Sequence, residues 1–347
     1  MDSSVTRNVA ECCGPIVFNV NAWAVMFGNE LREYIGRSHG TTEALRATSR
    51  GLDSLCAWLE DADHARTHWS RFHSVLETMK CSCVTKLGCG FSSRVWLIRD
   101  STGQREYAWK IVDCKLLTES YLGSSSEHRY ANEAVLLAQL AHDHIVKMFS
   151  WAEVPGSLLI ALEYLPGGTL MDYVNANGPC TEGCGLRFAS QLADVVVYLH
   201  CLHILHRDFK LENIVLASSE QPHCTLKVCD FGFARQVAKG CRCFTVVGTP
   251  VYMAPEIHAL SLSEYASSAK GYGFPVDMWS IGIVIYASFC VAFPFDGRNI
   301  SQQVVSGTVR YDDDDWFHLP RARDLVSNLL ERHPGNRITA MRLRDVV

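Results

Sequence analysis

The stretch His206-Arg207-Asp208-Phe209-Lys210-Leu211-Glu212-Asn213 decides how this chain is interpreted. It combines a carboxylate at Asp208 that can orient a hydroxyl, a lysine two positions later, and an amide at Asn213 that can ligate a metal. Further along comes Asp230-Phe231-Gly232, where a second carboxylate stands beside a glycine free to take unusual backbone angles. The two motifs in this order, with a short separation, are a far more specific signal than either one alone.

Together these motifs resemble the catalytic loop and the metal-binding loop of eukaryotic protein kinases. The resemblance covers the chain from about residue 82 to its end, and it implies an α+β, bilobal protein kinase fold. A small β-rich N-lobe is expected over about 82–162 and a larger helical C-lobe over about 166–347, with ATP between them. On this resemblance the chain stops within the last helix of the domain, so that helix is expected to be truncated.

The composition is that of a globular protein with a large core. The 347 residues are 48% hydrophobic and 20% charged, and the formal net charge is -5, which gives no general attraction to nucleic acid or anionic membrane. The 15 cysteines are scattered without paired Cys-x-x-Cys motifs, which favours free thiols in a reducing compartment over disulfides or zinc. We therefore expect a cytoplasmic protein, with the nucleus as the alternative. The apolar segment 15–28 is too short to span a membrane.

Residues 1–81 do not resemble a kinase domain. Apolar residues between Leu52 and Met79 recur at roughly helical spacing, with charged residues elsewhere, so a helical N-terminal extension is predicted. Two interpretations stay open for this extension. It either braces the kinase domain as a structural element, or it serves as a docking or autoinhibitory segment that binds a regulatory partner.

Strands are expected at 84–87, 95–98 and 107–112, with a turn at Gly88-Cys89-Gly90. This turn resembles the glycine-rich loop that covers ATP phosphates, although Ser93 stands where the family usually has a third glycine. The resemblance makes Lys110, on the third strand, the lysine that bridges two nucleotide phosphates. Glu133, on a helix predicted over 130–140, is expected to hold Lys110 in an ion pair.

The apolar run 158–165 followed by Pro166-Gly167-Gly168 resembles the hinge between the two kinase lobes. On this alignment Leu162 lines the back of the adenine pocket. The backbone carbonyl of Glu163 and the N–H of Leu165 are expected to bond the adenine edge. The apolar faces around the ring are assigned to Val95, Ala108 and Val215.

The resemblance also distributes the catalytic roles. Asp208 is expected to orient or accept the proton of the attacking hydroxyl, and Lys210 to neutralise charge on the transferred phosphoryl group. Asn213 and Asp230 are expected to hold Mg²⁺, with Mn²⁺ as a substitute. A hydrophobic stack of Leu137, Met148, His206 and Phe231 is also implied, with the helix that begins near Asp277 anchoring His206.

Lys210 together with Thr249 matches the serine/threonine members of the family, so the expected partners are proteins with serine or threonine acceptors. The ending Ala254-Pro255-Glu256 supports this, and Arg337 is expected to pair with Glu256. Two alternatives stay open: a pseudokinase-like scaffold that binds nucleotide without efficient transfer, and a kinase of small molecules. The stretches 230–235 and 292–296 resemble calmodulin-dependent or AMP-activated kinases, without fixing the subfamily.

The segment between Asp230 and Glu256 carries a regulatory hypothesis. Thr245 lies four positions before Thr249, and a phosphate on Thr245 can pair with Arg207 and order the segment. The alternative is a solvated loop threonine without a regulatory role.

Overall fold

A computed structural model describes residues 81–90, 93–100, 102–113, 129–154, 157–218, 224–262, 265, 270–311 and 316–347. The predicted helical extension over 1–81 therefore lies almost entirely outside the described residues. Within them the chain divides into two compact units. The first comprises the residues up to Ala131 together with Met148–Tyr164, and the second comprises Asn132–Lys147 and Leu165–Val347. Each unit is considered by itself below.

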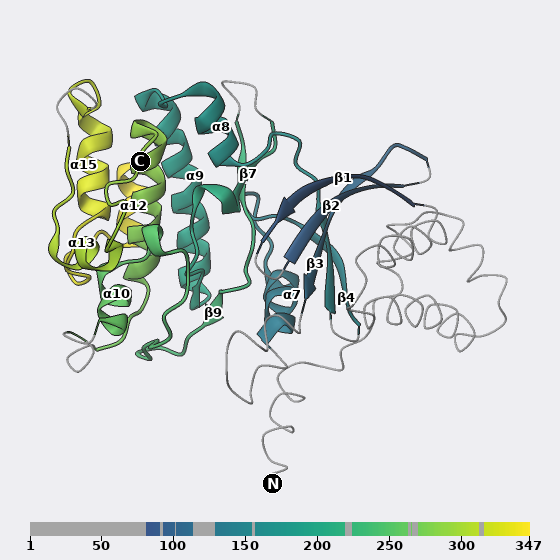
Figure 1. Cartoon of the computed structure of the whole chain (residues 1–347), viewed down its shortest axis with the longest axis horizontal. Helices are drawn as coiled ribbons and strands as arrows, with labels where there is room; N and C mark the ends of the chain where they lie inside the picture. The colour runs from purple at the N-terminus through teal and green to yellow at the C-terminus, as the bar shows by residue number, and fades with distance from the viewer. Residues whose placement is uncertain are drawn as a thin grey trace, which may run out of the picture. The chain divides into compact units, whose positions relative to one another are not determined.

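The first unit is built on an antiparallel sheet with the strand order β1-β2-β3-β5-β4 (Figure 1). Its strands are β1 (Cys81–Cys89), β2 (Ser93–Asp100), β3 (Glu106–Asp113), β4 (Met148–Val154) and β5 (Ser157–Glu163). Aromatic and β-branched residues such as Trp109 and Ile160 are buried here, as strand propensity favours. The β-rich unit predicted from the sequence is thus confirmed.

The turn predicted at Gly88-Cys89-Gly90 is wrong in its position. Strand β1 continues through Gly88 and Cys89, which pair with Val95 and Arg94 across an antiparallel ladder. The chain reverses only after Gly90, whose N–H donates to the carbonyl of Ser93 at 2.8 Å. The strand does not end at Gly88, because a register shift between Lys86 and Gly88 accommodates the glycine within the ladder.

Helix α7 (Arg129–Gln139) confirms the helix predicted at 130–140. The loop that follows it belongs to the second unit and is held there by backbone hydrogen bonds. Val146 N–H donates to the carbonyl of Val228 at 2.9 Å, and Val228 N–H donates to the carbonyl of His144 at 2.8 Å. This loop therefore lies alongside strand β8 (Leu226–Val228).

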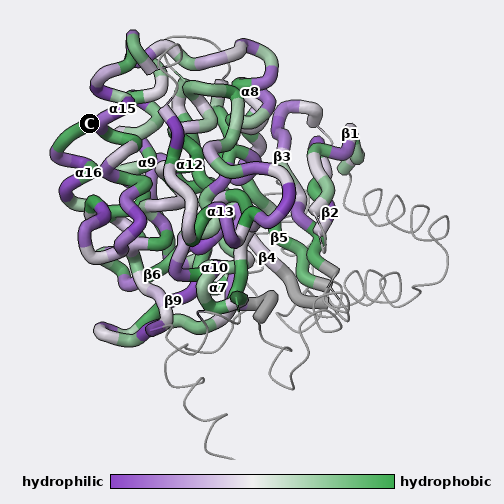
Figure 2. Tube along the Cα trace, turned by 60° about the vertical axis from the view of Figure 1, so that its left-hand side comes forward, coloured by the Kyte–Doolittle hydropathy of each residue, from purple (hydrophilic) through white to green (hydrophobic). Residues whose placement is uncertain are grey.

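The second unit is mainly helical, which confirms the helical C-lobe. Its two central helices are α9 (Glu182–Cys201) and α12 (Pro275–Cys290), which pack against each other (Figure 1). Helix α9 begins at Glu182, because Thr181 caps it by accepting the N–H of Cys184 at 3.4 Å. Residues 276–289 of α12 are all buried, and Figure 2 shows hydrophobic residues along this helix.

The remaining elements surround this pair. The helices are α8 (Leu170–Asn177), α10 (Pro255–Ser261), α13 (Ile300–Ser306), α15 (Pro320–Leu329) and α16 (Ala340–Val346), with short 3-10 turns η2 (Leu211–Asn213) and η3 (Pro250–Tyr252). Two small antiparallel pairs join β6 (Ile204–Leu205) to β9 (Arg235–Gln236) and β7 (Ile214–Leu216) to β8. In the part of the chain that the structure describes, no helix has the length and apolar character needed to cross a bilayer.

Candidate active site

Asp208 lies at the centre of a cluster that the sequence motifs predicted. Its carboxylate is only 2% exposed, and each of its oxygens accepts two hydrogen bonds. Oδ1 accepts the backbone N–H of Thr249 at 3.0 Å and its hydroxyl at 2.9 Å. Oδ2 accepts the Lys210 ammonium at 2.7 Å and the Asn213 amide at 3.0 Å. Three residues, Lys210, Asn213 and Thr249, from two distant stretches of the chain thus converge on one carboxylate.

The backbone next to Asp208 is held in place by a second buried acid, Asp277. Asp277, at the start of α12, accepts the backbone N–H of His206 at 3.0 Å and that of Arg207 at 2.8 Å. The second bond helps Arg207 keep a left-handed backbone angle, φ 67°, which is unfavourable for a residue with a side chain. His200 adds a third bond to Asp277 at 3.0 Å. The expected anchoring of His206 by the Asp277 helix is confirmed.

Asn213 and Asp230 stand at the same end of a strand pair. Ile214 pairs with Val228 across β7 and β8, and Cys229 N–H donates to the carbonyl of Asn213 at 2.9 Å. The Asn213 amide nitrogen also donates to the carbonyl oxygen of Asp208 at 2.9 Å. Because that nitrogen is committed to Asp208, the amide oxygen is the atom left for a metal ion.

This donor set fits Mg²⁺. An amide oxygen and the carboxylate of Asp230 are hard ligands, and Mg²⁺ binds through few protein groups while keeping waters and substrate phosphates. Among the described residues no cluster of three or more His, Cys, Asp or Glu side chains has metal-binding geometry. A site with two protein ligands therefore fits phosphate-bound Mg²⁺ better than a structural metal enclosed by protein.

The loop of Asp230-Phe231-Gly232 is tightly folded. Asp230 has φ 60°, and its carboxylate accepts the N–H of Gly232 at 3.2 Å. A Cβ atom at Gly232 would come within 3.5 Å of a carboxylate oxygen of Glu133. Glu133 is 4% exposed, so α7 places this buried acid beside the loop, within the second unit.

Part of the predicted hydrophobic stack is confirmed. Phe231 is fully buried and meets the ring of His206 edge-on, with centroids 4.8 Å apart. Burial lowers the pKa of His206, and the acids Asp277, Asp208 and Asp230 oppose that shift only in part, so the ring is neutral at ordinary pH. Leu137 is buried in the same unit. Met148 belongs to the first unit, and its part in the stack stays a prediction.

The residues expected to bind nucleotide on the sheet share one face. Val95 pairs with Lys110, Leu97 pairs with Ala108, and Ala108 pairs with Leu162, so these side chains project to the same side. Lys110 is 7% exposed although lysine is rarely buried. Lys110 is therefore not an ordinary solvated surface lysine.

The other expected nucleotide contacts lie on both units. Gly88 and Cys89 end β1, Gly90 directly follows it, and Glu163 ends β5. Leu165 and Val215 belong to the second unit, as does Glu133. The Lys110–Glu133 ion pair joins residues of different units, so it stays a prediction.

Several residues near Asp208 were not predicted from the sequence. Tyr252 donates its hydroxyl to Glu212 at 3.1 Å, and Ser280 donates to the Tyr252 carbonyl at 2.8 Å. His200 and His258 are bonded in or near the same region. A polar residue within a strongly apolar helix, such as Ser280 in α12, is a signal that could have identified one of them.

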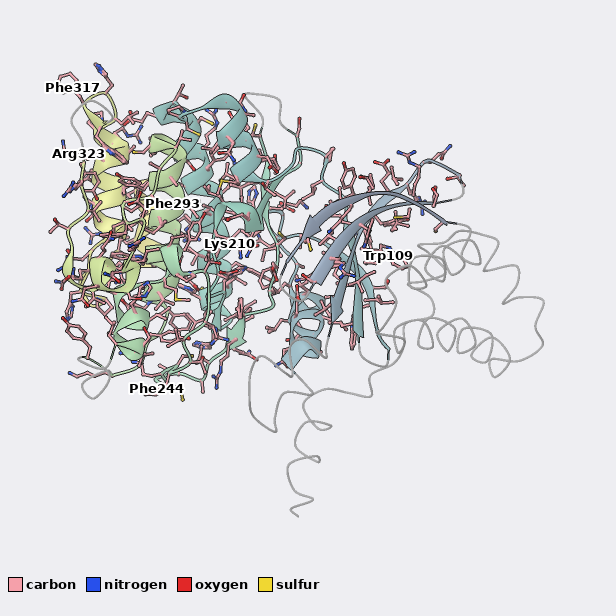
Figure 3. The ribbon with its side chains drawn as sticks, viewed as in Figure 1. Trp109, Lys210, Phe244, Phe293, Phe317 and Arg323 are labelled. Atoms are coloured by element: carbon pink, nitrogen blue, oxygen red, sulfur yellow. The ribbon has the colours of Figure 1, made fainter. Side chains whose placement is uncertain are left out.

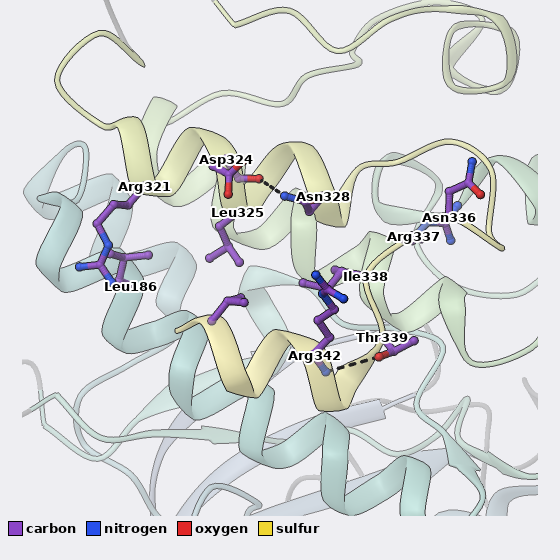
Figure 4. Close-up of a pocket in the computed structure, with 11 residues that line it drawn as sticks. Leu186, Arg321, Asp324, Leu325, Asn328, Asn336, Arg337, Ile338, Thr339 and Arg342 are labelled. Carbon is purple, nitrogen blue, oxygen red and sulfur yellow. Dashed lines mark hydrogen bonds between the residues drawn. The ribbon is translucent and has the colours of Figure 1, made fainter.

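A pocket of about 520 Å³ lies elsewhere, among α9, α15 and α16 (Figure 4). Arg321, Leu325 and Arg342 are among its lining residues. None of the residues predicted for catalysis, metal binding or nucleotide binding lines it. By contrast, Lys210, labelled in Figure 3, lies beside the Asp208 carboxylate. This pocket is therefore separate from the Asp208 cluster.

The family model for the protein kinase domain matches residues 82–346. The meiosis-specific serine/threonine-protein kinase mek1 of Schizosaccharomyces pombe is 34% identical over 256 residues, which are 73% of this chain and 55% of the relative. The mouse serine/threonine-protein kinase DCLK3 is 33% identical over 260 residues, covering 73% and 31%. Myosin light chain kinase A of Dictyostelium discoideum is 29% identical over 259 residues, covering 74% and 83%.

The chain therefore belongs to the protein kinase family, and the relatives to which it is similar include serine/threonine kinases. The matched segments span about half of mek1 and about a third of DCLK3. Within the family the subfamily stays open, because relatives of several kinds match with similar identity.

Proposed function

We propose that this protein transfers the γ-phosphoryl group of ATP to serine or threonine hydroxyls of proteins. The observation that carries the proposal is the convergence of Lys210, Asn213 and Thr249 on the buried carboxylate of Asp208. Phosphoryl transfer depends on positioning and charge neutralisation more than on covalent chemistry, and this cluster supplies both. Family membership supports the same activity.

In this mechanism Asp208 is the base that orients the acceptor hydroxyl and receives its proton. Lys210 is already within 2.7 Å of Asp208, so its ammonium stands where negative charge builds up on the transferred group. Asn213 and Asp230 would hold Mg²⁺, which when bound neutralises charge on the nucleotide phosphates. Mn²⁺ has similar ligand preferences and is the proposed substitute.

We assign nucleotide binding to residues of both units. Lys110, held by Glu133, would bind the phosphates, and the backbone of Gly88, Cys89 and Gly90 would cover them. The carbonyl of Glu163 and the N–H of Leu165 would bond the adenine edge. Val95, Ala108 and Val215 would supply apolar contacts to the ring. The shared sheet face of Val95, Ala108 and Lys110 supports this assignment.

We also propose a cytoplasmic or nuclear site of action, and partners that are proteins rather than nucleic acid. The cysteines that the structure describes are thiols rather than disulfides, as a reducing compartment favours. The net charge of -5 offers no general attraction to nucleic acid. The segment 1–81 is the proposed docking site for a regulatory partner.

The test uses the purified full chain with Mg-ATP and an arrayed library of serine, threonine and tyrosine peptides. Asp208→Asn should lower kcat by about 10²–10⁴-fold because it removes the base. The matched control is Asp143→Asn, an exposed acid that should leave kcat unchanged. Nucleotide binding is measured separately by thermal shift. A wild type that binds Mg-ATP without phosphorylating any peptide would instead be a scaffold, and a parallel screen of metabolites would reveal a small-molecule kinase.

A further inference from the structure

A buried histidine connects the acceptor side of this site to a helix far along the chain. His258, in α10, is 2% exposed. Its Nε2 lies 3.0 Å from the carbonyl oxygen of Pro250, and its Nδ1 lies 2.9 Å from the hydroxyl of Ser301 in α13. The carbonyl can only accept, so Nε2 carries the hydrogen. In the neutral ring Nδ1 then accepts the Ser301 hydroxyl, which fixes the tautomer.

The carbonyl held by His258 belongs to Pro250, which adjoins the Asp208 cluster. Pro250 directly follows Thr249, whose hydroxyl and N–H both donate to Asp208. Pro250 is exposed and Val251 is half-buried, so a substrate segment can reach this turn. When the acceptor hydroxyl of a substrate lies within reach of Asp208, the substrate residues next to it lie beside this turn.

The other end of the turn η3 is fixed by different groups. Ser280 donates to the carbonyl of Tyr252 at 2.8 Å, and the Tyr252 hydroxyl donates to Glu212 at 3.1 Å. Thr249 is fixed by Asp208. The carbonyl of Pro250, between these two points, is held by His258 and by the N–H of Met253 at 3.2 Å. His258 is therefore the side chain that controls the middle of the turn.

We propose that His258 is a positioning residue for the protein substrate. Its Nε2–H fixes the Pro250 carbonyl so that the turn Thr249-Pro250-Val251 offers a defined edge to the segment carrying the acceptor hydroxyl. Ser301 keeps the ring in the tautomer that can donate. This inference rests on the proposed kinase function and adds a determinant of substrate binding to it.

A histidine that only filled the core would behave differently. If His258 only filled space, a leucine of similar volume could replace it, and the contacts to Pro250 and Ser301 would have no role. Here each ring nitrogen has a partner in a different element, and burial lowers the pKa of His258, which agrees with a neutral ring that donates from one nitrogen and accepts at the other. The contact to Pro250 is therefore specific to Nε2.

The two amide replacements of His258 separate these readings. In His258→Gln the amide nitrogen can stand near the former Nε2 and still donate to Pro250, whereas His258→Asn reaches only toward Ser301. Steady-state kinetics are measured for both variants, for His258→Leu and for Ser301→Ala, with the best peptide from the library screen as the probe. The Michaelis constants for peptide and for ATP are determined separately, and melting temperatures are recorded for each protein.

We expect His258→Asn and His258→Leu to raise the peptide KM about tenfold, the effect of one lost buried hydrogen bond, while the ATP KM stays within about twofold. His258→Gln should stay within about threefold of wild type, and Ser301→Ala should raise the peptide KM by a smaller factor than His258→Asn. Equal peptide KM values for the Gln and Asn variants would overturn the inference, as would equal changes in the two KM values.

Should His258→Leu fail to fold, the Gln and Asn pair and Ser301→Ala carry the same test. Wild-type activity combined with indistinguishable amide variants would overturn this inference alone. A wild type that transfers no phosphoryl group to any peptide would overturn the proposed function, and this inference with it.

Discussion

Arg337 and Glu256, 81 positions apart in the sequence, form a two-point ion pair, with Nη1 2.8 Å and Nη2 3.0 Å from the two carboxylate oxygens. The remaining donors of the guanidinium are also used. Nη1 reaches the carbonyl of Pro275 at 2.7 Å, Nη2 that of Arg332 at 3.0 Å, and Nε that of Glu331 at 2.8 Å. This pair joins the end of the segment that begins at Asp230 to the loop before α16, and it confirms the sequence prediction.

Replacement of Arg337 by lysine should destabilise the fold. The guanidinium is buried, lies 5.2 Å from the ring centre of Trp279 and donates in a planar arrangement that one ammonium cannot reproduce. We expect Arg337→Lys to lower the free energy of unfolding by about 3 kcal/mol, as for other broken buried ion pairs. Urea unfolding followed by circular dichroism measures this difference.

The control for that measurement is Arg342→Lys, an exposed arginine of α16 whose backbone N–H, rather than its side chain, bonds Thr339. Its free energy of unfolding should change by no more than about 0.5 kcal/mol. If the two lysine variants unfold at the same urea concentration, the bonds around Arg337 contribute nothing to stability.

Asp277 gives a prediction that depends on pH. Burial raises the pKa of this carboxyl, but the hydrogen bond and charge of His200, together with His206 and the N–H of Arg207, outweigh burial and hold the pKa below its usual value of 3.8. A depressed pKa in the folded state means that the ionised carboxylate stabilises the fold above the unfolded pKa of about 3.9. That stabilisation is lost as pH falls through the folded pKa.

Asp277→Asn should therefore cost about 3 kcal/mol of stability at neutral pH, because each carboxylate oxygen accepts one backbone N–H and the amide NH₂ that replaces one of these oxygens cannot accept it. The gap to wild type should stay constant from about pH 8 to pH 5 and narrow below about pH 4. Urea unfolding at a series of pH values tests this. Asp345→Asn, an exposed acid of α16, is the control, and a gap that widens on acidification would contradict the argument.

The sequence predicted the site better than the details of the chain path. Asp208, Lys210 and Asn213 lie within one short stretch of the chain, so their proximity could be predicted from the sequence. The turn near Gly88 was misplaced, because glycine permits a turn without requiring one, and the pairing of β1 with β2 decided the outcome. Pairing between the two strands therefore outweighed the local preference of glycine for a turn.

Contacts between distant stretches were the other gap. Nothing in the run Pro255-Glu256-Ile257-His258 indicates that the imidazole meets Ser301, 43 positions later. The same holds for Glu182, whose carboxylate accepts the N–H groups of Arg321 and Ala322 and so caps α15. Such pairs depend on how whole helices pack, which residue spacing along one helix does not reveal.

Phosphorylation of Thr245 should activate the protein. Arg207 Nη1 already lies 3.1 Å from the Thr245 hydroxyl, and the Tyr272 hydroxyl donates to the Thr245 carbonyl at 2.7 Å. A phosphate there would form charge-assisted hydrogen bonds with Arg207 and order the segment. The neighbouring Phe244 is exposed at the edge of the unit, so the segment is accessible to a kinase (Figure 3).

We expect phosphatase treatment to lower kcat/KM about tenfold or more, and Thr245→Ala to give the same low value with or without treatment. Arg207→Gln should also remove the difference, since it removes the charge that binds the phosphate. Thr308→Ala, at an exposed threonine, is the control. Mass spectrometry reports the state of Thr245, and equal activity of the phosphorylated and unphosphorylated forms would contradict the hypothesis.

The hydroxyl of Thr249 should matter more for catalysis than for stability. It accepts from the Lys210 ammonium at 3.1 Å and donates to Asp208 at 2.9 Å, so it keeps the Asp208 carboxylate and the Lys210 ammonium in a fixed relative position. Thr249→Val preserves the shape and removes only the hydroxyl, while the backbone N–H bond to Asp208 persists. We expect kcat to fall about tenfold or more, with a melting temperature within a few degrees of wild type.

Thr249→Ser keeps the hydroxyl and should retain most of the wild-type kcat. Equal kcat values for the valine and serine variants would show that the site does not depend on the hydroxyl, and the role assigned to this hydrogen-bond network would have to be abandoned.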